Sequence, residues 1–501
     1  MNFNKQILIL VLSLFSCSIH AKDIKVSIEP DTTTVLRNPL SGWVMYLGRT
    51  WDENFWVNQG YDAMPADNGK TKVRVSDYAS TCYIRTSWSS FEPEEGKYVW
   101  NDSDSRLHKL LNSCLKRGMK LAFRIVVDSR DQGQNTPLYV KEAGAKGFSD
   151  PNNSKLWSPF PDDSVFQQKY AKFLEAMAGQ YNDPEKVDFI DAFGLGKWGE
   201  AHGLIFEDYK NKEQVFNWIT DLYARTFTRI PLLINYHRLV ADTISWASPN
   251  KDSRRLLEAA INKGYSLRHD AFGMTDYYQE WEKSFAREWN FQRPVIMEGG
   301  WITGGHHRYW VDSSNAYREG HSEDVRRGEY ELSREAHVNM MDFRVGDETH
   351  SWFYDSFDLV KGFIREGGYR LYPFSITATD KARADAILKI QHCWRNLGWG
   401  YCPTNIPQWN QKYKVGIALM DQHGKIVKIA VERKSDLSTW IKGSDQSYET
   451  EFSLKGLKKG HYTWLIGLVD TTKDNLPGIQ MAVSSKVLHQ GWMAFGMLKI
   501  K

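Results

Sequence analysis

Between residues 42 and 354 the chain alternates short apolar runs with segments whose apolar side chains recur at helical spacing. The apolar runs lie at residues 42–48, 80–85, 120–127, 188–193, 230–237, 267–276, 294–297 and 350–354. Helical spacing is found at residues 104–117, 165–181, 213–225, 254–263 and 331–344. Strands that alternate with amphipathic helices are typical of a parallel sheet covered by helices, and eight such strands predict an α/β fold, a closed (β/α)8 TIM barrel.

An open, doubly wound sheet is the alternative architecture. No Gly-x-Gly-x-x-Gly turn follows the first predicted strand, which favours the barrel. From residue 367 onward the pattern changes to short alternating runs separated by turns, which predicts a C-terminal antiparallel β-sandwich. A chain of 501 residues is long enough for two domains. We assign residues 22–366 to the barrel domain, including a short strand expected at its beginning, and residues 367–501 to the sandwich.

The first 21 residues have the layout of a secretion signal peptide. Lys5 supplies a positive charge, residues 7–15 form an apolar core, and residues 18–21 provide a cleavage site. The apolar run is too short to cross a bilayer, and we expect no membrane span elsewhere. We therefore expect a protein exported to the periplasm or the cell exterior. Residues 14–17 also resemble a bacterial lipobox, so a surface lipoprotein anchored at Cys17 is an alternative.

The charge balance argues against one class of partner. With 64 Lys and Arg against 61 Asp and Glu, the formal net charge is +3, which does not indicate binding of nucleic acid or another polyanion. Aromatic residues make up 14% of the chain and include 20 tryptophans. Such residues can anchor a large core, or their flat rings can line a carbohydrate groove.

Four cysteines follow the predicted signal: Cys82, Cys114, Cys393 and Cys402. An exported protein can form disulfides, and Cys393 and Cys402 bracket a glycine-rich segment that they could staple as a hairpin. Cys82 lies in an apolar run, where we expect a buried free thiol. No pattern of cysteine and histidine has the spacing of a zinc site, so we predict no metal.

Two of the predicted strands lead to a glutamate beside glycine and tryptophan. The fourth is followed by Gly-Leu-Gly-Lys-Trp198-Gly-Glu200-Ala-His202, and the seventh ends in Met-Glu298-Gly-Gly-Trp301. Because active groups of (β/α)8 barrels lie at the C-terminal ends of the strands, Glu200 and Glu298 can face each other across a bound sugar. Glycoside hydrolysis uses two carboxyl groups, about 5–5.5 Å apart for retention of configuration and about 6.5–9.5 Å apart for inversion. The aromatic surroundings of Glu200 suit a protonated acid.

These features resemble glycoside hydrolase clan A, the retaining (β/α)8 group that includes many β-galactosidases, β-mannosidases and cellulases. The resemblance rests on the two glutamates, their strands, Trp352 and the phrase Trp-Ser-Ser-Phe-Glu-Pro-Glu-Glu-Gly-Lys-Tyr-Val-Trp at residues 88–100. It implies that Glu200 is the acid/base, Glu298 is the nucleophile and Trp352 lies under the sugar that is cleaved. It also implies a carbohydrate substrate and no metal or organic cofactor. The C-terminal part resembles the sandwich of uncharacterised bacterial polysaccharide-degrading proteins.

One position departs from the clan pattern. Clan members usually carry asparagine directly before the acid/base, where it bonds the sugar 2-hydroxyl, and this chain has Gly199 there. Either Lys197, His202 or Asn235 takes over that contact, or the substrate differs at that position.

The candidates for substrate binding are Trp88, Arg124, Trp198, His202, Asn235, His237, Asp270, Asp276, Trp301 and Trp352. Arg124, like Arg85, lies inside an apolar strand, and because an unpaired buried charge is costly, each is expected to hold a carboxylate. Such a pair can be structural or can contact the substrate. Asp270 and Asp276 either contact the sugar or cap a loop.

Two other functions fit parts of the pattern. A glycan-binding protein on a degenerate barrel would keep the aromatic groove without turnover. A polysaccharide lyase would need a Tyr, His or Lys base at an acidic sugar, for which His-His-Arg-Tyr-Trp at residues 306–310 is the candidate. A solvated loop is the other interpretation of that segment.

Overall fold

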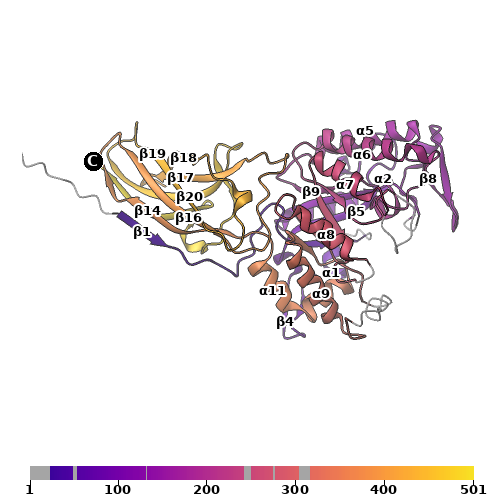
Figure 1. Ribbon diagram of the computed structural model, residues 1–501, viewed down its shortest axis with the longest axis horizontal. Coiled ribbons are helices and arrows are strands. Elements are labelled where there is room, and N and C mark those ends of the chain that lie inside the picture. The colour runs from indigo at the N-terminus through magenta and orange to yellow at the C-terminus, as the bar shows by residue number, and fades with distance from the viewer. Residues whose placement is uncertain (1–22, 49–53, 131–132, 242–249, 275–276, 304–315) are drawn as a thin grey trace, which may run out of the picture.

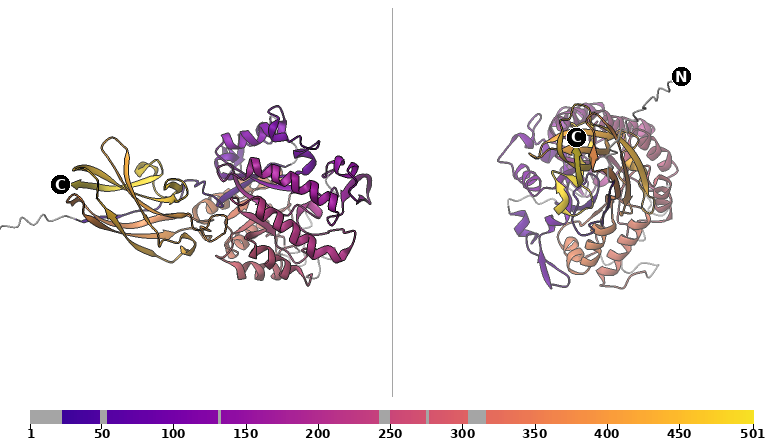
Figure 2. Two further views of the ribbon diagram at one scale, coloured as in Figure 1. Left: turned by 90° about the horizontal axis from the view of Figure 1, so that it is seen from above. Right: turned by 90° about the vertical axis from the view of Figure 1, so that its left-hand side faces the viewer.

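The computed structural model describes residues 23–48, 54–130, 133–241, 250–274, 277–303 and 316–501. Its N-terminal part is a closed barrel of parallel strands, which confirms the predicted architecture, and its C-terminal part contains two mainly antiparallel sheets. The two parts form lobes that lie side by side along the longest axis of the molecule (Figure 1; Figure 2). The predicted signal peptide, Asp276 and residues 306–310 lie outside the described residues.

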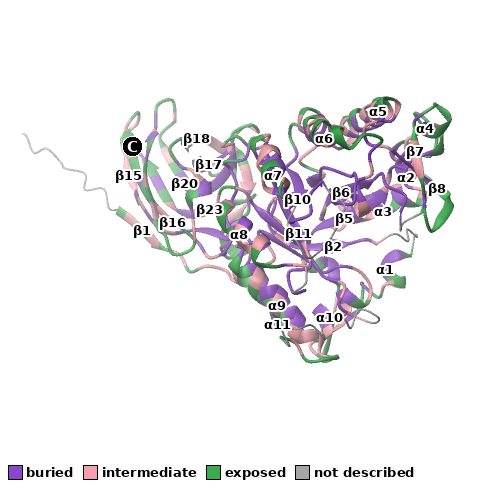
Figure 3. Ribbon diagram, turned by 45° about the vertical axis from the view of Figure 1, so that its right-hand side comes forward, coloured by how far each residue is buried: buried purple, intermediate pink, exposed green. Residues whose placement is uncertain are grey.

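Eight parallel strands close the barrel in chain order. They are β2 (Gly42–Tyr46), β5 (Ala79–Ser87), β6 (Lys120–Val126), β9 (Val187–Asp191), β10 (Leu232–Asn235), β11 (Tyr265–Asp270), β12 (Val295–Glu298) and β13 (Met340–Asp342). The helices that cover the barrel include α3 (Arg106–Lys116), α5 (Ser164–Tyr181), α6 (Lys212–Thr226), α7 (Ser253–Asn262), α8 (Glu280–Trp289), α9 (Ser322–Glu335) and α11 (Phe357–Glu366). Figure 3 shows the strands as a buried layer inside helices whose outer faces are exposed.

Alternate residues of each barrel strand face the interior. Val44, Tyr83, Ala122, Leu233 and Ile296 belong to a buried cluster in the barrel interior that continues into the C-terminal lobe, whereas their sequence neighbours pack outward against the helices. The C-terminal lobe therefore packs at the N-terminal end of the strands. The residues two positions further along the strands also face inward, nearer to the C-terminal end. They are Tyr46, Arg85, Arg124, Asn235 and Glu298.

Two packed sheets form the C-terminal lobe, as the alternating sequence pattern predicts. One sheet has the order β1-β14-β16-β19 and the other β15-β23-β20-β17-β18, where β1 is Asp23–Ser27 and β15 is Lys381–Ala382. The long strands are β14 (Leu371–Thr379), β16 (Ile387–Asn396), β17 (Tyr413–Met420), β18 (Ile426–Glu432), β19 (Gln446–Ser453), β20 (Gly460–Asp470) and β23 (Trp492–Ile500). Trp394, Phe452 and Trp464 are fully buried between the sheets, so large aromatic rings fill this core.

The first described strand, β1 (Asp23–Ser27), belongs to the C-terminal lobe. It pairs antiparallel with β14, from Asp23 opposite Thr379 to Ser27 opposite Ser375, and Figure 1 shows the two strands adjacent at one edge of the sheet. The sequence predicts the strand itself, and the structure gives its partner. The chain thus crosses from the sandwich to the barrel near residue 40 and returns near residue 367.

The eighth barrel strand differs from the prediction. Residues 350–354 lie in helix α10 (Asp347–Tyr354), and the strand is β13. The predicted helix at residues 331–344 is wrong for the same reason, because its C-terminal part is this strand. Met340 pairs with both Ile296 of β12 and Gly42 of β2, so this three-residue strand closes the barrel. A strand of three residues is too short to show an alternating sequence pattern, so its pairing with β12 and β2 decides that it is a strand.

One further expectation is corrected. Cys393 and Cys402 are both free thiols, so the predicted hairpin disulfide is wrong, while Cys82 is buried and free as expected. The segment from residue 128 to residue 163 carries helix α4 (Leu138–Glu142) and the hairpin of β7 (Gly147–Asp150) and β8 (Asn153–Pro159). None of the helices in the described ranges has the length and apolar character needed to cross a membrane.

Candidate active site

One arginine joins the two glutamates at the C-terminal end of the barrel interior. Arg124 of β6 is fully buried, and its Nη1 donates to Glu200 Oε1 at 2.6 Å while its Nη2 donates to Glu298 Oε2 at 3.0 Å. Its Nε donates to Asp191 Oδ2 at 2.7 Å. A planar guanidinium is suited to such multiple pairing. We refer to Asp191, Glu200 and Glu298 as the carboxylate cluster.

Glu298 ends β12 and has a fully buried side chain. Its Oε1 accepts from Arg344 Nη1, and its Oε2 accepts from Arg268 Nη2 at 2.9 Å and from Arg124. Burial by itself would raise the pKa of Glu298, but the positive charges of Arg344, Arg124 and Arg268 outweigh it and hold this pKa well below the usual range. Glu298 is therefore ionised, as a carboxylate nucleophile must be.

Glu200 follows β9 and is also nearly inaccessible, with 7% of its side chain exposed. Besides the bond to Arg124, it lies 3.5 Å from Arg85 Nη1 and 3.5 Å from His202 Nε2. Burial opposes ionisation, but the charge of Arg124 and the hydrogen bond with His202 lower the pKa of Glu200 to about 2. In the ligand-free protein Glu200 is thus a carboxylate, whereas an acid must carry a proton.

A left-handed turn brings Glu200 to Arg124. It contains the 3-10 segment η3 (Lys197–Gly199), in which Trp198 has a φ of 55° and Gly199 a φ of 75°. A Cβ atom at Gly199 would lie 3.2 Å from Arg124 Cδ and 3.3 Å from Gly194 Cα. These distances are shorter than most contacts of a Cβ atom, so a side chain at this position would have to displace the Arg124 side chain or the Gly194 backbone by a few tenths of an ångström. The turn therefore leaves little room for a side chain at Gly199.

A histidine supports the backbone of the same turn. His237 Nδ1 accepts from the Leu239 N–H at 3.0 Å, so its Nε2 carries the hydrogen and donates to the Glu200 carbonyl oxygen at 3.0 Å. Burial, together with the neighbouring His202, lowers the pKa of His237 well below its usual value, so the ring is neutral. His202 stacks at an angle against Trp198, with ring centroids 5.3 Å apart. The structure thus brings His237, His202 and Trp198 to Glu200.

Asp270 and Trp301 also lie beside the carboxylate cluster. Asp270 of β11 stands in register with Glu298 on the adjacent strand, and 25% of its side chain is exposed. Burial and the negative charges of Glu200 and Glu298 raise the pKa of Asp270. Trp301 is half-buried, and its ring centroid lies 4.9 Å from the Arg344 guanidinium carbon. Both side chains are therefore placed at the solvent-facing edge of the cluster.

Trp88 and Trp352 do not join this group. Trp88, in α2 (Trp88–Phe91), is fully buried against Tyr170 and Phe173 of α5, and its Nε1 donates to Glu92 Oε2 at 2.8 Å. Trp352 lies on α10, fully buried with its ring 5.0 Å from that of Trp43. Neither ring has surface left for a sugar, so both expected substrate contacts are corrected to core packing. The assignment of Trp352 depended on an eighth strand at residues 350–354, and these residues form part of helix α10.

The structure adds charged residues that the sequence analysis missed. Arg268 and Arg344 bind Glu298, Asp191 binds Arg124, and Asp342 at the end of β13 faces the same interior. Burial raises the pKa of Asp342 to about 6. A signal for Arg268 was present, since it lies inside a strand as Arg85 and Arg124 do. Asp342 and Arg344 fell in a segment predicted to be helical.

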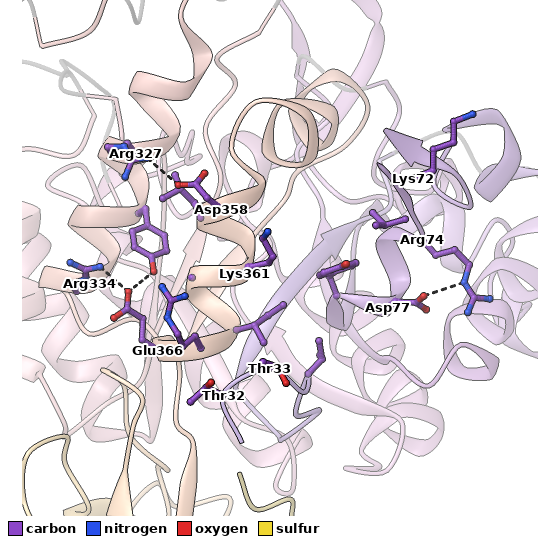
Figure 4. A pocket seen from close by; sticks show the side chains of 18 of the residues that line it. Thr32, Thr33, Lys72, Arg74, Asp77, Arg327, Arg334, Asp358, Lys361 and Glu366 are labelled. Atoms are coloured by element: carbon purple, nitrogen blue, oxygen red, sulfur yellow. Dashed lines mark hydrogen bonds and ion pairs between the residues drawn. The ribbon is translucent and has the colours of Figure 1, made fainter. Parts of the chain in front are cut away.

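A separate surface cavity of about 1090 Å³ is lined by residues of α9, α11 and the segments near residues 32 and 74, and it shares no lining residue with the carboxylate cluster. In Figure 4 its charged side chains face one another in pairs, such as Arg327 with Asp358 at 3.3 Å and Arg334 with Glu366 at 2.9 Å. Because these charged side chains pair with one another in contact with solvent, we interpret this cavity as a solvated groove. Over the described part of the chain, no group of three or more His, Cys, Asp or Glu side chains is arranged to hold a metal ion.

Fold and site together define a (β/α)8-barrel protein with an arginine-bridged carboxylate cluster at the C-terminal end of its strands. No protein-family model matches the chain, and no curated protein matches its sequence significantly. Similar solved structures include an exo-beta-1,4-mannosidase, Op5Man5, from Opitutaceae bacterium strain TAV5, with a TM-score of 0.40 and 15% identity over 68% of this chain and 64% of that chain. This chain therefore matches less than two thirds of the mannosidase's length.

For two other similar structures, the match extends over nearly the whole length of the other protein. An endo-beta-1,4-mannanase from Thermotoga petrophila has a TM-score of 0.40 and 9% identity, over 93% of this chain and 98% of that chain. Endo-glycoceramidase II from Rhodococcus sp. has a TM-score of 0.35 and 13% identity, over 83% of this chain and 99% of that chain.

Proposed function

We propose that this protein is an exported retaining glycoside hydrolase that cleaves a poly- or oligosaccharide with Glu298 as nucleophile and Glu200 as acid/base. The observation that carries the proposal is the single guanidinium of Arg124, which binds both glutamates at the end of the barrel where active groups lie. Two carboxylates bound to one guanidinium are close enough to act on the same glycosidic bond. The signal peptide predicted from the sequence supports export.

The proposed reaction has two steps. Glu298 attacks the anomeric carbon and forms a glycosyl ester, while the bond to the leaving oxygen breaks and that oxygen takes a proton from Glu200. Glu200 then removes a proton from water, and the hydroxide attacks the same carbon and frees Glu298. Because Glu298 is held ionised by three arginines, the first step needs no base. Neither step uses a metal or an organic cofactor.

The state of Glu200 leads to a prediction about pH. Since the pKa of Glu200 is about 2 in the free protein, the protonated fraction rises as pH falls. We expect kcat/KM for a substrate with a poor leaving group to rise from about pH 8 to about pH 5, and kcat/KM for a dinitrophenyl glycoside to stay flat. Both profiles are measured with the same enzyme, so the second is the control. A profile that rises equally for both substrates would contradict the acid role.

The contribution of Glu200 to stability does not change over the pH range of this measurement. Glu200 has a folded-state pKa near 2 and an ordinary value of 4.5, so its stabilising contribution is fully present above about pH 4.5 and is lost only as pH falls toward about 2. The range used for the kinetics lies above this window.

A glycan-binding protein without turnover is the second candidate, and one observation favours it. The Glu298 side chain is 0% exposed, and arginines occupy both of its oxygens. A hydrolase requires that the anomeric carbon reach one of these atoms.

A polysaccharide lyase is a third candidate. It would need a base within residues 306–310, which lie outside the described residues.

One experiment separates the two candidates. The wild type is incubated with a panel of aryl glycosides and polysaccharides, and the anomer released first is identified by NMR. Product of retained configuration supports the proposed function, and product of inverted configuration contradicts the retaining mechanism. If the wild type, Glu200→Gln and Glu298→Ala bind glycan equally and none cleaves it, the protein is a binding protein.

A further inference from the structure

Within the described ranges, the buried side-chain amide of Asn235 makes no hydrogen bond. It is the last residue of β10, and it faces the barrel interior because Leu233 belongs to the interior cluster while Ile234 packs outward. Only 2% of Asn235 is exposed. Neither its Nδ2 nor its Oδ1 has a partner among the residues that the structure describes.

Such an amide is unfavourable unless something binds it. A buried polar group without a partner costs about 1–3 kcal/mol, and few such groups occur in native proteins. Asn339 is equally buried, and its Nδ2 donates to the carbonyl oxygens of Leu40 at 3.0 Å and Tyr401 at 2.8 Å. Asn339 therefore shows how this protein satisfies a structural amide, and Asn235 does not follow that pattern.

The position of Asn235 is between the two glutamates. β10 pairs with β9, which leads to Glu200, and with β11, which pairs with β12 and Glu298. On β11, the residue opposite Asn235 is Arg268, and its guanidinium binds Glu298. His237, two residues further on, donates to the Glu200 carbonyl. The Asn235 amide thus lies on the part of the barrel between the two glutamates, beside the position expected for the anomeric carbon.

The chemistry of the amide selects what it can bind there. On either side of the anomeric carbon a sugar has its ring oxygen and the carbon that bears the 2-hydroxyl. The ring oxygen only accepts hydrogen bonds, and it becomes positively charged in the oxocarbenium-like transition state, which disfavours a donor. A hydroxyl both donates and accepts, as does the Asn235 amide. The match is therefore with the hydroxyl.

We propose that Asn235 determines specificity by hydrogen-bonding the 2-hydroxyl of the sugar that is cleaved. The inference rests on the proposed function, since it places the anomeric carbon between Glu200 and Glu298. It is also compatible with Gly199, since this glycine has no side chain to offer and a Cβ atom there would lie only 3.2 Å from Arg124 Cδ. Sugars with a free 2-hydroxyl are the substrate class that this assignment defines.

The test compares Asn235→Ala with the wild type on an aryl glycoside and on its 2-deoxy analogue. On the parent substrate, kcat/KM falls about tenfold to hundredfold in the variant, because its 2-hydroxyl loses its partner. On the 2-deoxy substrate the two proteins have the same kcat/KM. An equal loss on both substrates, or no loss on the parent, overturns the proposal.

Stability provides a second readout, with Asn339→Ala as the matched control. Asn339→Ala lowers the melting temperature, since two buried carbonyl groups lose their donor. Asn235→Ala does not lower it. A loss as large as that of the control, or failure to fold, shows that the Asn235 amide is structural and overturns the proposal.

A failure of the proposed function is recognised separately. If the wild type hydrolyses none of the substrates, calorimetry is used to measure binding of thioglycosides instead. The wild type and Asn235→Ala are each tested with the parent sugar and with its 2-deoxy analogue, which gives four combinations. Weaker binding of the parent sugar alone to Asn235→Ala then supports the contact without hydrolysis, and equal binding in all four overturns it.

Discussion

Replacing Glu298 by alanine is expected to lower kcat/KM by a factor on the order of 10⁴ or more, the largest effect of any single change in this protein. The substitution removes the atom that forms the bond to the anomeric carbon, and no other side chain can take its place. Glu282→Ala is the control, because Glu282 is also fully buried and is paired with Arg238 at 3.0 Å, outside the carboxylate cluster. That variant should lose stability but keep turnover.

Added azide distinguishes the two glutamates by stereochemistry. In Glu298→Ala azide can enter the space left by the carboxylate and displace an activated leaving group directly, which gives a glycosyl azide of inverted configuration. In Glu200→Ala the glycosyl ester on Glu298 still forms, and azide then displaces Glu298, which gives retained configuration. The products are identified by NMR. The opposite pairing of variant and product would exchange the two roles, and full activity of Glu298→Ala would end the assignment.

Arg124→Met is expected to lower the free energy of unfolding by about 3–5 kcal/mol at neutral pH, because it leaves buried carboxylates without their shared cation. The partners affected are Asp191, Glu200 and Glu298. Arg117→Met is the control, since the pair of Arg117 with Asp62 is 25% and 38% exposed and should contribute at most about 1 kcal/mol. Denaturant unfolding measures both variants.

The loss in Arg124→Met should also depend on pH. Arg124 lowers the pKa of Glu200, so its stabilising effect through Glu200 is complete above about pH 4.5 and declines as pH falls toward about 2. The difference between wild type and variant is therefore expected to shrink as the pH is lowered through this range. Equal losses in the two arginine variants, or a difference that is constant with pH, would show that Arg124 acts through packing alone.

The barrel and the carboxylate pair were predictable because both depend on local patterns. Apolar runs of strand length, helices with apolar residues at regular spacing and a glutamate at two strand ends are visible in the sequence without knowledge of the partners. Arg85 and Arg124 were also recognisable, since a charge inside an apolar strand must be paired. These features share one property, which is that a few neighbouring residues define them.

The errors concern features that distant residues define. β13 is a strand only because Ile296 and Gly42 pair with Met340 from both sides. Trp88 and Trp352 are core residues because other elements cover their rings, and nothing near them in sequence indicates this. The role of Gly199 depends on the path of Arg124. Tertiary contacts thus decided each of these positions.

The pairing of β1 with β14 has a consequence for the order of events during synthesis. Asp23 leaves the ribosome early, but its partner Thr379 follows only after every strand of the barrel has been made. The barrel can close first, and β1 must then wait as a free strand. Until it docks, β14 presents an unpaired edge that another chain could join. Removal of residues 23–27 would leave β14, a longer strand than β1, at the edge of the sheet, so a truncated chain should aggregate more readily than the full chain even with its barrel intact.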